Sequence, residues 1–157
     1  MFRTAWVGVL AFLVDRIGKQ LAVEWLELDT PMVLWEGVFH LTYTQNTGMA
    51  FSILAGRTWL LIVLSSLALV ILVSALYRAL PRTQMASALL WLLLAGGIGN
   101  LADRLIFGYV VDFFSVQFVQ FPVFNVADIC LTVSAIFLII ALLRHPDEKK
   151  IHEQPNL

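Results

Sequence analysis

The chain has 157 residues, of which 60% are hydrophobic and only 13% are charged, and its mean hydropathy is +0.85. Soluble domains carry about a quarter charged residues, so this composition predicts an integral membrane protein, with residues 1–157 forming a single domain. The net charge of −1 gives no general attraction to nucleic acid. The lone Cys130 cannot form an internal disulfide, and three scattered histidines predict no metal site.

Four apolar segments are long enough to cross a hydrocarbon core of ~30 Å, which takes about 20 helical residues. They are residues 5–23, 59–80, 85–106 and 124–143. The first is interrupted by Asp15, Arg16 and Lys19, so it is no cleavable signal peptide, whose apolar region is uninterrupted. We interpret it as a retained spanning helix with polar groups facing the interior. The fold class predicted is therefore an all-α membrane protein with four transmembrane helices.

The connection at residues 24–56 is more than a linker. Residues 38–44 are rich in β-branched and aromatic side chains, which is typical of a strand, and Asn46, Thr47 and Gly48 then favour a turn. Amphipathic rings collect at the headgroup level of a membrane. Four rings of this segment fit that zone: Trp25, Trp35, Phe39 and Tyr43. We expect a small extracytoplasmic β-sheet that lies on the outer membrane surface.

The distribution of charge predicts the orientation. Basic residues gather at one set of helix ends, namely Arg3, Arg78, Arg82, Arg144, Lys149 and Lys150. The other side is acidic, with Glu24, Glu27, Asp29, Glu36 and Asp112, and Arg57 is the main exception. The positive-inside rule puts both termini and the turn at Pro81 in the cytoplasm. The polar tail, residues 145–157, is expected to be disordered. The second outer connection, residues 107–123, is short and aromatic.

Residues 96–128 place acids and amides among long apolar runs. Ionisable residues in a membrane are costly and mark a functional site by default. Asp112, just after the third helix, and Asp128, at the start of the fourth, are expected at similar depth near the outer interface. Two facing carboxylates cannot both ionise cheaply, so one keeps a proton. Such a pair can activate a water and protonate a leaving amine.

Structural interpretations of the same residues stay open. Asn125 with Asp128 is typical of a helix N-cap with an acidic third residue, and Asp112 could be a solvated loop acid. Asn100 and Asp103 share a helical face, where they could support a site or pack with Arg104 as a tolerated ion pair. Asp15 and Lys19 have the i,i+4 spacing of a structural salt bridge. Cys130 fits a packed small residue.

Five motifs, in order, now identify a resemblance. They are Asp15-Arg16-Ile-Gly-Lys19, Asn46-Thr-Gly48-Met-Ala50-Phe51-Ser52, Gly99-Asn100-Leu-Ala-Asp103-Arg104, Val110-Val111-Asp112-Phe113 and Phe124-Asn125-Val126-Ala127-Asp128. Over nearly its whole length the chain resembles the lipoprotein signal peptidases (signal peptidase II), the aspartic proteases of the bacterial inner membrane. Three features depart from the family pattern: Ile129, Gln45 and the short connection from Asp112 to Asn125.

The resemblance implies an activity and a set of residues. The family cleaves diacylglyceryl-prolipoproteins immediately before the lipid-modified cysteine, uses no metal or other cofactor, and is inhibited by globomycin-type cyclic peptides. Its catalytic aspartates match Asp112 and Asp128. Its substrate-binding and supporting positions match Asn46, Gly48, Asn100, Asp103, Arg104, Asn125, Ala127 and Asp15. We expect a monomer in contact with membrane lipids, with both termini cytoplasmic and the active site near the outer face of the inner membrane.

Two other classes of function compete with this prediction. A small transporter would line a polar path with Asp15, Asp103, Arg104 and Asp128, and would need polar groups through the full depth of the bundle. A non-catalytic assembly factor would use the outer aromatic segment for docking and would tolerate Asp-to-Asn changes at positions 112 and 128. The clustering of acids at one end favours the peptidase.

Overall fold

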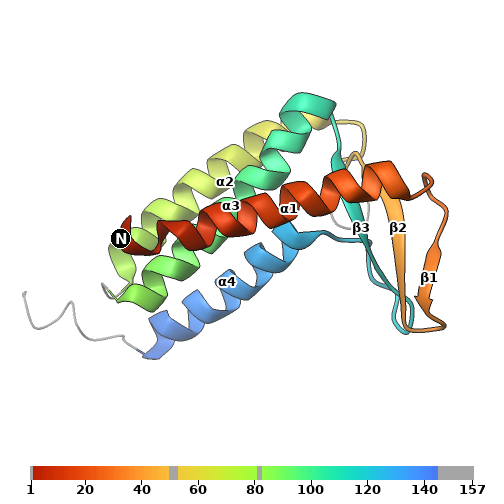
Figure 1. Cartoon of the computed structure of the whole chain (residues 1–157). Helices are drawn as coiled ribbons and strands as arrows, with labels where there is room; N and C mark the ends of the chain where they lie inside the picture. The colour runs from red at the N-terminus through yellow and green to blue at the C-terminus, as the bar shows by residue number, and fades with distance from the viewer. Residues whose placement is uncertain (1, 50–52, 81–82, 145–157) are drawn as a thin grey trace, which may run out of the picture.

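The computed structural model describes residues 2–49, 53–80 and 83–144, so the expectations for the motif residues 50–52, the Pro81 turn and the tail lie outside the described residues. Within these ranges, four long α-helices form a bundle with a small sheet at one end (Figure 1). The helices are α1 (Ala5–Trp25), α2 (Thr58–Ala79), α3 (Gln84–Phe107) and α4 (Val126–Arg144), and a short 3-10 helix, η1 (Phe2–Thr4), precedes α1.

Three helices, α2, α3 and α4, are long and apolar enough to cross a membrane. The remaining predicted span, α1, is long enough but carries four charged residues, so it is not among the candidate spans. These residues are Asp15, Arg16, Lys19 and Glu24. The chain is therefore mostly helical with three candidate spans, which agrees with the predicted class but not with the full count of four. The predicted helix boundaries are close to those found, except that α4 begins at Val126 rather than at residue 124.

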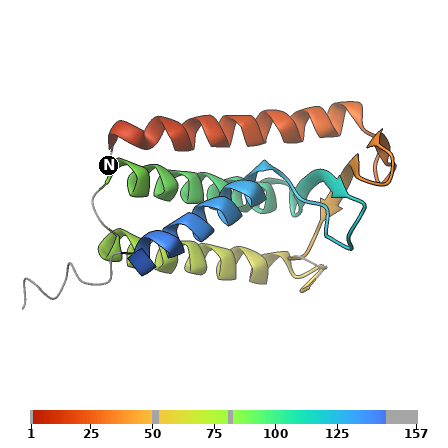
Figure 2. The same cartoon turned by 90° about the horizontal axis from the view of Figure 1, so that it is seen from below.

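Helix α3 is the centre of the bundle, because it packs against α1, α2 and α4. Figure 2 shows α1 and α2 on opposite sides of α3, with α4 crossing it. The crossing is close: a Cβ added to Gly96 would lie 2.5 Å from the carbonyl oxygen of Ala127 on α4. This close approach at Gly96 places the first turn of α4 directly against the polar part of α3.

The sheet has three antiparallel strands in the order β1-β2-β3, namely β1 (Met32–Trp35), β2 (Phe39–Asn46) and β3 (Val110–Val116). The predicted strand at residues 38–44 corresponds to β2. Strand β3 was not predicted, because its first four residues are all buried and lack the alternation of a half-exposed strand. Its register pairs Asp112 with Thr44, so Asp112 is a strand residue and not a solvated loop acid.

The aromatic residues of the outer segment divide into two groups. Trp25 and Trp35 are 76% and 69% exposed, as expected for rings at a membrane surface. Tyr43 is only 8% exposed and packs with Ala22, Val111 and Phe113 beneath the sheet. Its ring therefore fills the contact between α1 and the sheet and does not face outward.

Candidate active site

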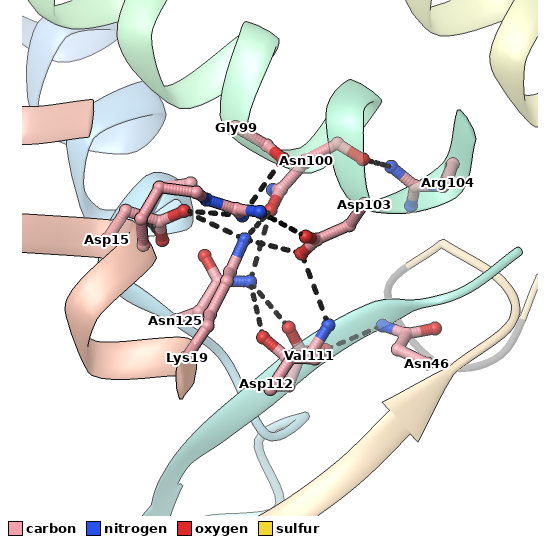
Figure 3. A network of polar contacts seen from close by, with 12 residues as sticks. Asp15, Lys19, Asn46, Gly99, Asn100, Asp103, Arg104, Val111, Asp112 and Asn125 are labelled. Atoms are coloured by element: carbon pink, nitrogen blue, oxygen red, sulfur yellow. Dashed lines mark hydrogen bonds and ion pairs between the residues drawn. The ribbon is translucent and has the colours of Figure 1, made fainter. Parts of the chain in front are cut away.

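Four charged side chains from α1 and α3 form an ion cluster, defined here as Asp15, Arg16, Lys19 and Asp103. Asp15, Lys19 and Asp103 are buried (Figure 3), and Arg16 is partly exposed. Lys19 Nζ lies 2.9 Å from Asp15 Oδ2 and 2.8 Å from Asp103 Oδ2. Arg16 Nη1 lies 2.6 Å from Asp103 Oδ1, and Arg16 Nη2 lies 3.0 Å from Asp15 Oδ2. Two acids thus face two bases, and this pairing lets charges exist in an apolar bundle. The predicted Asp15–Lys19 pair is confirmed.

The ion cluster also fixes the backbone of the neighbouring elements. Asp15 Oδ1 accepts a hydrogen bond of 2.8 Å from the amide of Ala127 at the start of α4. Asp103 Oδ2 accepts one of 3.4 Å from the amide of Val111 on β3. The residues that follow these two amides in sequence are Asp128 and Asp112. The cluster therefore sets the positions from which both predicted catalytic acids project.

Asp112 is 2% exposed and is held by two side-chain amides. Asn125 Nδ2 donates to its Oδ1 at 2.6 Å, and Asn46 Nδ2 donates to its Oδ2 at 2.8 Å. Burial and the nearby charge of Asp128 raise the pKa of Asp112 from its ordinary 3.8 to about 7, against the opposing effect of the two amide donors and of Lys19. At neutral pH, Asp112 is therefore poised between its protonated and ionised forms.

Asp128 lies in the first turn of α4 and takes part in its cap. Its Oδ2 accepts from the Asn125 amide at 3.1 Å, while Asn125 Oδ1 accepts from the Asp128 amide at 2.9 Å. This reciprocal pair confirms the predicted capping interaction. Its other oxygen, Oδ1, accepts a hydrogen bond of 2.7 Å from Asn100 Nδ2. The Asp128 side chain can therefore cap α4 through one oxygen and contact Asn100 through the other.

Asp112 and Asp128, called the carboxylate pair below, line one cavity of about 470 Å³. Asn46, Asn100 and Arg104 complete its polar end. The remaining wall is mainly apolar and consists of Met49, Val110, Phe121, Pro122, Val123, Phe124, Ile129, Thr132 and Val133. A second hollow of about 440 Å³ shares Asn46 and Asp112 and runs along the end of β2. Asp112 therefore lies where an apolar chamber and a polar groove meet.

Arg104 had been expected to pair with an acid or to reach the interface. Its Nη1 donates to the carbonyl of Asn100 at 3.3 Å, and its Nη2 donates to the carbonyl of Gly48 at 2.9 Å. The interpretation of Asp103 and Arg104 as an ion pair is wrong, because Asp103 faces α1 and binds Lys19 and Arg16. Arg104 instead joins α3 to the turn after β2, where the Gly48 amide donates to Asn46 Oδ1 at 2.9 Å.

All the predicted site residues are brought together around this cavity and the ion cluster. Two contacting residues, Arg16 and Lys19, were not among them. Their signal was present in the sequence, since three charges within five residues of an apolar helix need partners on another helix. Among the residues that the structure describes, no group of three or more His, Cys, Asp or Glu side chains could hold a metal ion.

The sequence and fold of this chain are similar to those of known proteins. A family model described as Signal peptidase (SPase) II matches residues 7–144. A lipoprotein signal peptidase of Lactiplantibacillus plantarum is 37% identical over 142 residues, which cover 90% of this chain and 95% of that relative. One from Nostoc punctiforme is 39% identical over 142 residues, which cover 88% of this chain and 89% of that relative.

The fold comparison agrees with the sequence comparison. A solved structure described as a bacterial membrane enzyme has a TM-score of 0.80 and 26% identity, and the match covers 100% of this chain and 96% of that one. A second structure with the same description has a TM-score of 0.74 and 28% identity, covering 91% of this chain and 94% of that one. The similarity thus extends over both the bundle and the sheet.

Proposed function

The chain belongs to the signal peptidase II family, and we propose that Asp112 and Asp128 carry out its peptidase reaction as an aspartic dyad. As a member, it is a membrane protease that removes signal peptides from prolipoproteins. The observation that supports the dyad is that the two carboxylates come from different elements and line one cavity. Among the described residues, no Lys, Arg or His nitrogen lies within 4 Å of either carboxylate, so both are held by amides alone.

In the proposed reaction the pair shares one proton. The ionised carboxylate takes a proton from a water whose oxygen attacks the scissile carbonyl carbon, while the protonated carboxyl gives its proton to the carbonyl oxygen. The tetrahedral intermediate then collapses: the C–N bond breaks, and the carboxyl that gained the water proton gives it to the departing amine. The other carboxylate takes back a proton from a hydroxyl of the intermediate as the C=O bond re-forms, so the pair again shares one proton. The products are a signal peptide with a new carboxyl end and a lipoprotein with a free cysteine amine. The two acids titrate as a unit during this cycle.

The two parts of the site suit the two parts of a diacylglyceryl-prolipoprotein. Ile129, Thr132 and Val133 lie on one face of α4, at i, i+3 and i+4, and with Phe121 they form an apolar wall for acyl chains. The groove beside β2 suits an extended peptide. We infer cleavage immediately before the lipid-modified cysteine, because Asp112 lies where these two regions meet and Asp128 lines the apolar one. Globomycin-type cyclic peptides would compete for the same cavity.

We also infer that α1 is a fourth transmembrane helix. Every exposed residue between Trp6 and Ile17 is apolar, whereas Asp15 and Lys19 are buried against α3. Two of the charges that lower its hydropathy, Asp15 and Lys19, thus face protein and not lipid. Four spans place the N-terminus and the end of α4 on one side, opposite the sheet (Figure 1). With the positive-inside rule this puts both termini in the cytoplasm and the site at the outer face of the bacterial inner membrane.

One chain supplies every residue of the proposed site, which supports a monomer as the active form. The transporter alternative is disfavoured, since the exposed face of α2 from Leu60 to Leu72 is apolar except for serine at its boundary, and the charged groups gather near the sheet end of the bundle. The assembly-factor alternative differs in its tolerance of Asp-to-Asn changes, which the following experiment measures.

The test is cleavage of a diacylglyceryl-modified prolipoprotein by purified protein in detergent, followed as a shift on a gel. Asp112→Asn and Asp128→Asn should each lower the rate by about 10²- to 10⁴-fold. Asp29→Asn is the matched control, because it removes an exposed acid at a left-handed position that asparagine accepts. If folded Asp112→Asn and Asp128→Asn proteins cut at the rate of this control, the dyad assignment is wrong.

A further inference from the structure

The ammonium group of Lys19 links the ion cluster to the carboxylate pair. A protonated lysine has three donor hydrogens and no acceptor. Each of the three has a partner: Asp15 Oδ2 at 2.9 Å, Asp103 Oδ2 at 2.8 Å and Asn100 Oδ1 at 2.9 Å. The first two contacts pair charges within the cluster. The third contact reaches Asn100, which itself contacts Asp128. A lysine that only formed ion pairs would not need this contact.

The contact with Lys19 decides how the Asn100 amide is oriented. Asn100 Oδ1 accepts from Lys19 Nζ and, at 3.2 Å, from Asn125 Nδ2, so its Nδ2 points to Asp128 Oδ1 at 2.7 Å. A flipped amide would set its NH₂ group against the lysine donors and its oxygen against the carboxylate. Because Lys19 can only donate, it excludes that orientation.

We propose that Lys19 is a positioning residue for the peptidase reaction: it holds Asn100 as a donor to Asp128 and supplies a positive charge that favours one ionised carboxylate in the pair. This inference rests on the proposed aspartic mechanism and deepens it. It assigns a role in the chemistry to a residue whose sequence spacing indicates only a helical salt bridge.

Arg104 lines the same cavity as the carboxylate pair and its charge also acts on both carboxylates, but neither it nor Arg16 hydrogen-bonds to the side chain of Asn100. The other charged and titratable groups on the packed elements are Asp15 and Arg16 on α1, Asp103 and Arg104 on α3, and Cys130 on α4. Arg16 binds Asp15, Asp103 and the Gly99 carbonyl. Arg104 binds the carbonyls of Asn100 and Gly48. Of the three basic residues, only Lys19 donates to the side-chain amide of Asn100, which contacts Asp128.

The electrostatics of Asp112 agree with this role. Burial and the charge of Asp128 raise the pKa of Asp112, whereas the donors Asn46 and Asn125 and the charge of Lys19 lower it, with the balance at about 7. Loss of the Lys19 charge should therefore raise the pH at which the pair gives up its first proton. The acid limb of the rate profile reports that ionisation.

The experiment compares Lys19→Met with Arg16→Met, the matched control. Both remove one positive charge from the same cluster and leave the same two acids, but only Lys19 contacts Asn100. The pH dependence of kcat and KM is measured with the diacylglyceryl-prolipoprotein substrate. Lys19→Met should move the acid limb of kcat/KM to higher pH by about one unit and lower kcat by about ten- to a hundredfold, with a smaller change in KM. In Arg16→Met the acid limb of kcat/KM should lie at the same pH as in the wild type.

Either single change could unfold the bundle by leaving an unpaired acid. In that case Asp103→Asn is added to both, which restores charge balance and keeps the comparison. If the two proteins lose the same fraction of activity at every pH, Lys19 is structural and the inference is overturned. Asp112→Asn in the same assay separates the two proposals. If it is inactive while Lys19→Met keeps the wild-type profile, only the Lys19 role fails; if Asp112→Asn is active, the aspartic mechanism fails too.

Discussion

The ion cluster and the carboxylate pair both contain acids that are buried or half-buried, but the partners of these acids differ. Asp15 and Asp103 contact Lys19 and Arg16 at 2.6 to 3.0 Å. The carboxylates of Asp112 and Asp128 contact Asn46, Asn100 and Asn125 and a backbone amide instead. The cluster is therefore electrically balanced, whereas the pair is hydrogen-bonded but has no directly paired cation among the described residues.

This difference separates two uses of a buried acid. An acid paired with a cation stays ionised, and its contribution is to hold helices together. An acid held by neutral donors keeps its geometry, but burial and a like charge leave it close to protonation at neutral pH. General acid and base chemistry needs the second condition. The amides of Asn100 and Asn125 lie between the two groups and connect them.

The largest expected effect on stability lies in the ion cluster. Asp103→Asn leaves Lys19 and Arg16 with one acid between them, and breaking a buried pair of this kind costs about 3–5 kcal/mol. Asp112→Asn, by contrast, loses only part of one hydrogen-bond set, at about 1 kcal/mol. Thermal unfolding of both variants in the same detergent should therefore show a much lower midpoint for Asp103→Asn. Equal midpoints would mean that the cluster does not hold the bundle together.

A smaller effect is expected where the two regions meet, at Asn125. Its Oδ1 caps α4 through the Asp128 amide, and its Nδ2 donates to Asp112. Asn125→Ala should lower stability by about 1 kcal/mol through loss of the cap and lower the cleavage rate by about ten- to a hundredfold through loss of a donor to a carboxylate.

Asn125→Ser distinguishes these two contributions. Serine is a good N-cap but has no side-chain amide to reach Asp112. The thermal midpoint of Asn125→Ser should return toward the wild-type value, while its cleavage rate stays as low as that of Asn125→Ala. Recovery of both would show that Asn125 matters only as a cap.

Much of this arrangement could be predicted from the sequence because membrane composition makes polar residues informative. The strand β2, the Asp15–Lys19 pair and the cap at Asp128 each depend on local sequence pattern. Local spacing cannot show which helix supplies a partner, so an ion pair of Asp103 with Arg104 stayed open as one interpretation. The true partners of Asp103 lie more than eighty residues earlier, on α1.

Strand β3 was missed for a related reason. Its residues Val110 to Phe113 are buried, covered by α1 on one side and by the residues before α4 on another. A buried strand of this kind has no polar alternation and differs little from the end of the preceding apolar helix. The predicted last helix also included residues 124 and 125, because their apolar surroundings do not distinguish helix from strand. In the structure the backbone of Phe124 pairs with that of Phe114.

A further expected effect is the pH dependence of stability that Asp112 alone produces. The pKa of Asp112 is about 7 in the folded protein and near its ordinary 3.8 when unfolded. Between these values the folded state holds a proton that the unfolded state has released, so stability is greatest at the acid end and falls as the pH rises toward about 7. Above that pH the contribution no longer changes.

Thermal midpoints between about pH 4 and about pH 8 measure this slope. Asp112→Asn should show a shallower decline than the wild type, because an amide has no proton to lose. Glu36→Gln removes an exposed carboxyl in the turn between β1 and β2 and should follow the wild-type slope. If Asp112→Asn declines as steeply as Glu36→Gln, Asp112 is ionised throughout this range, and the contrast between a balanced cluster and a pair near protonation is lost.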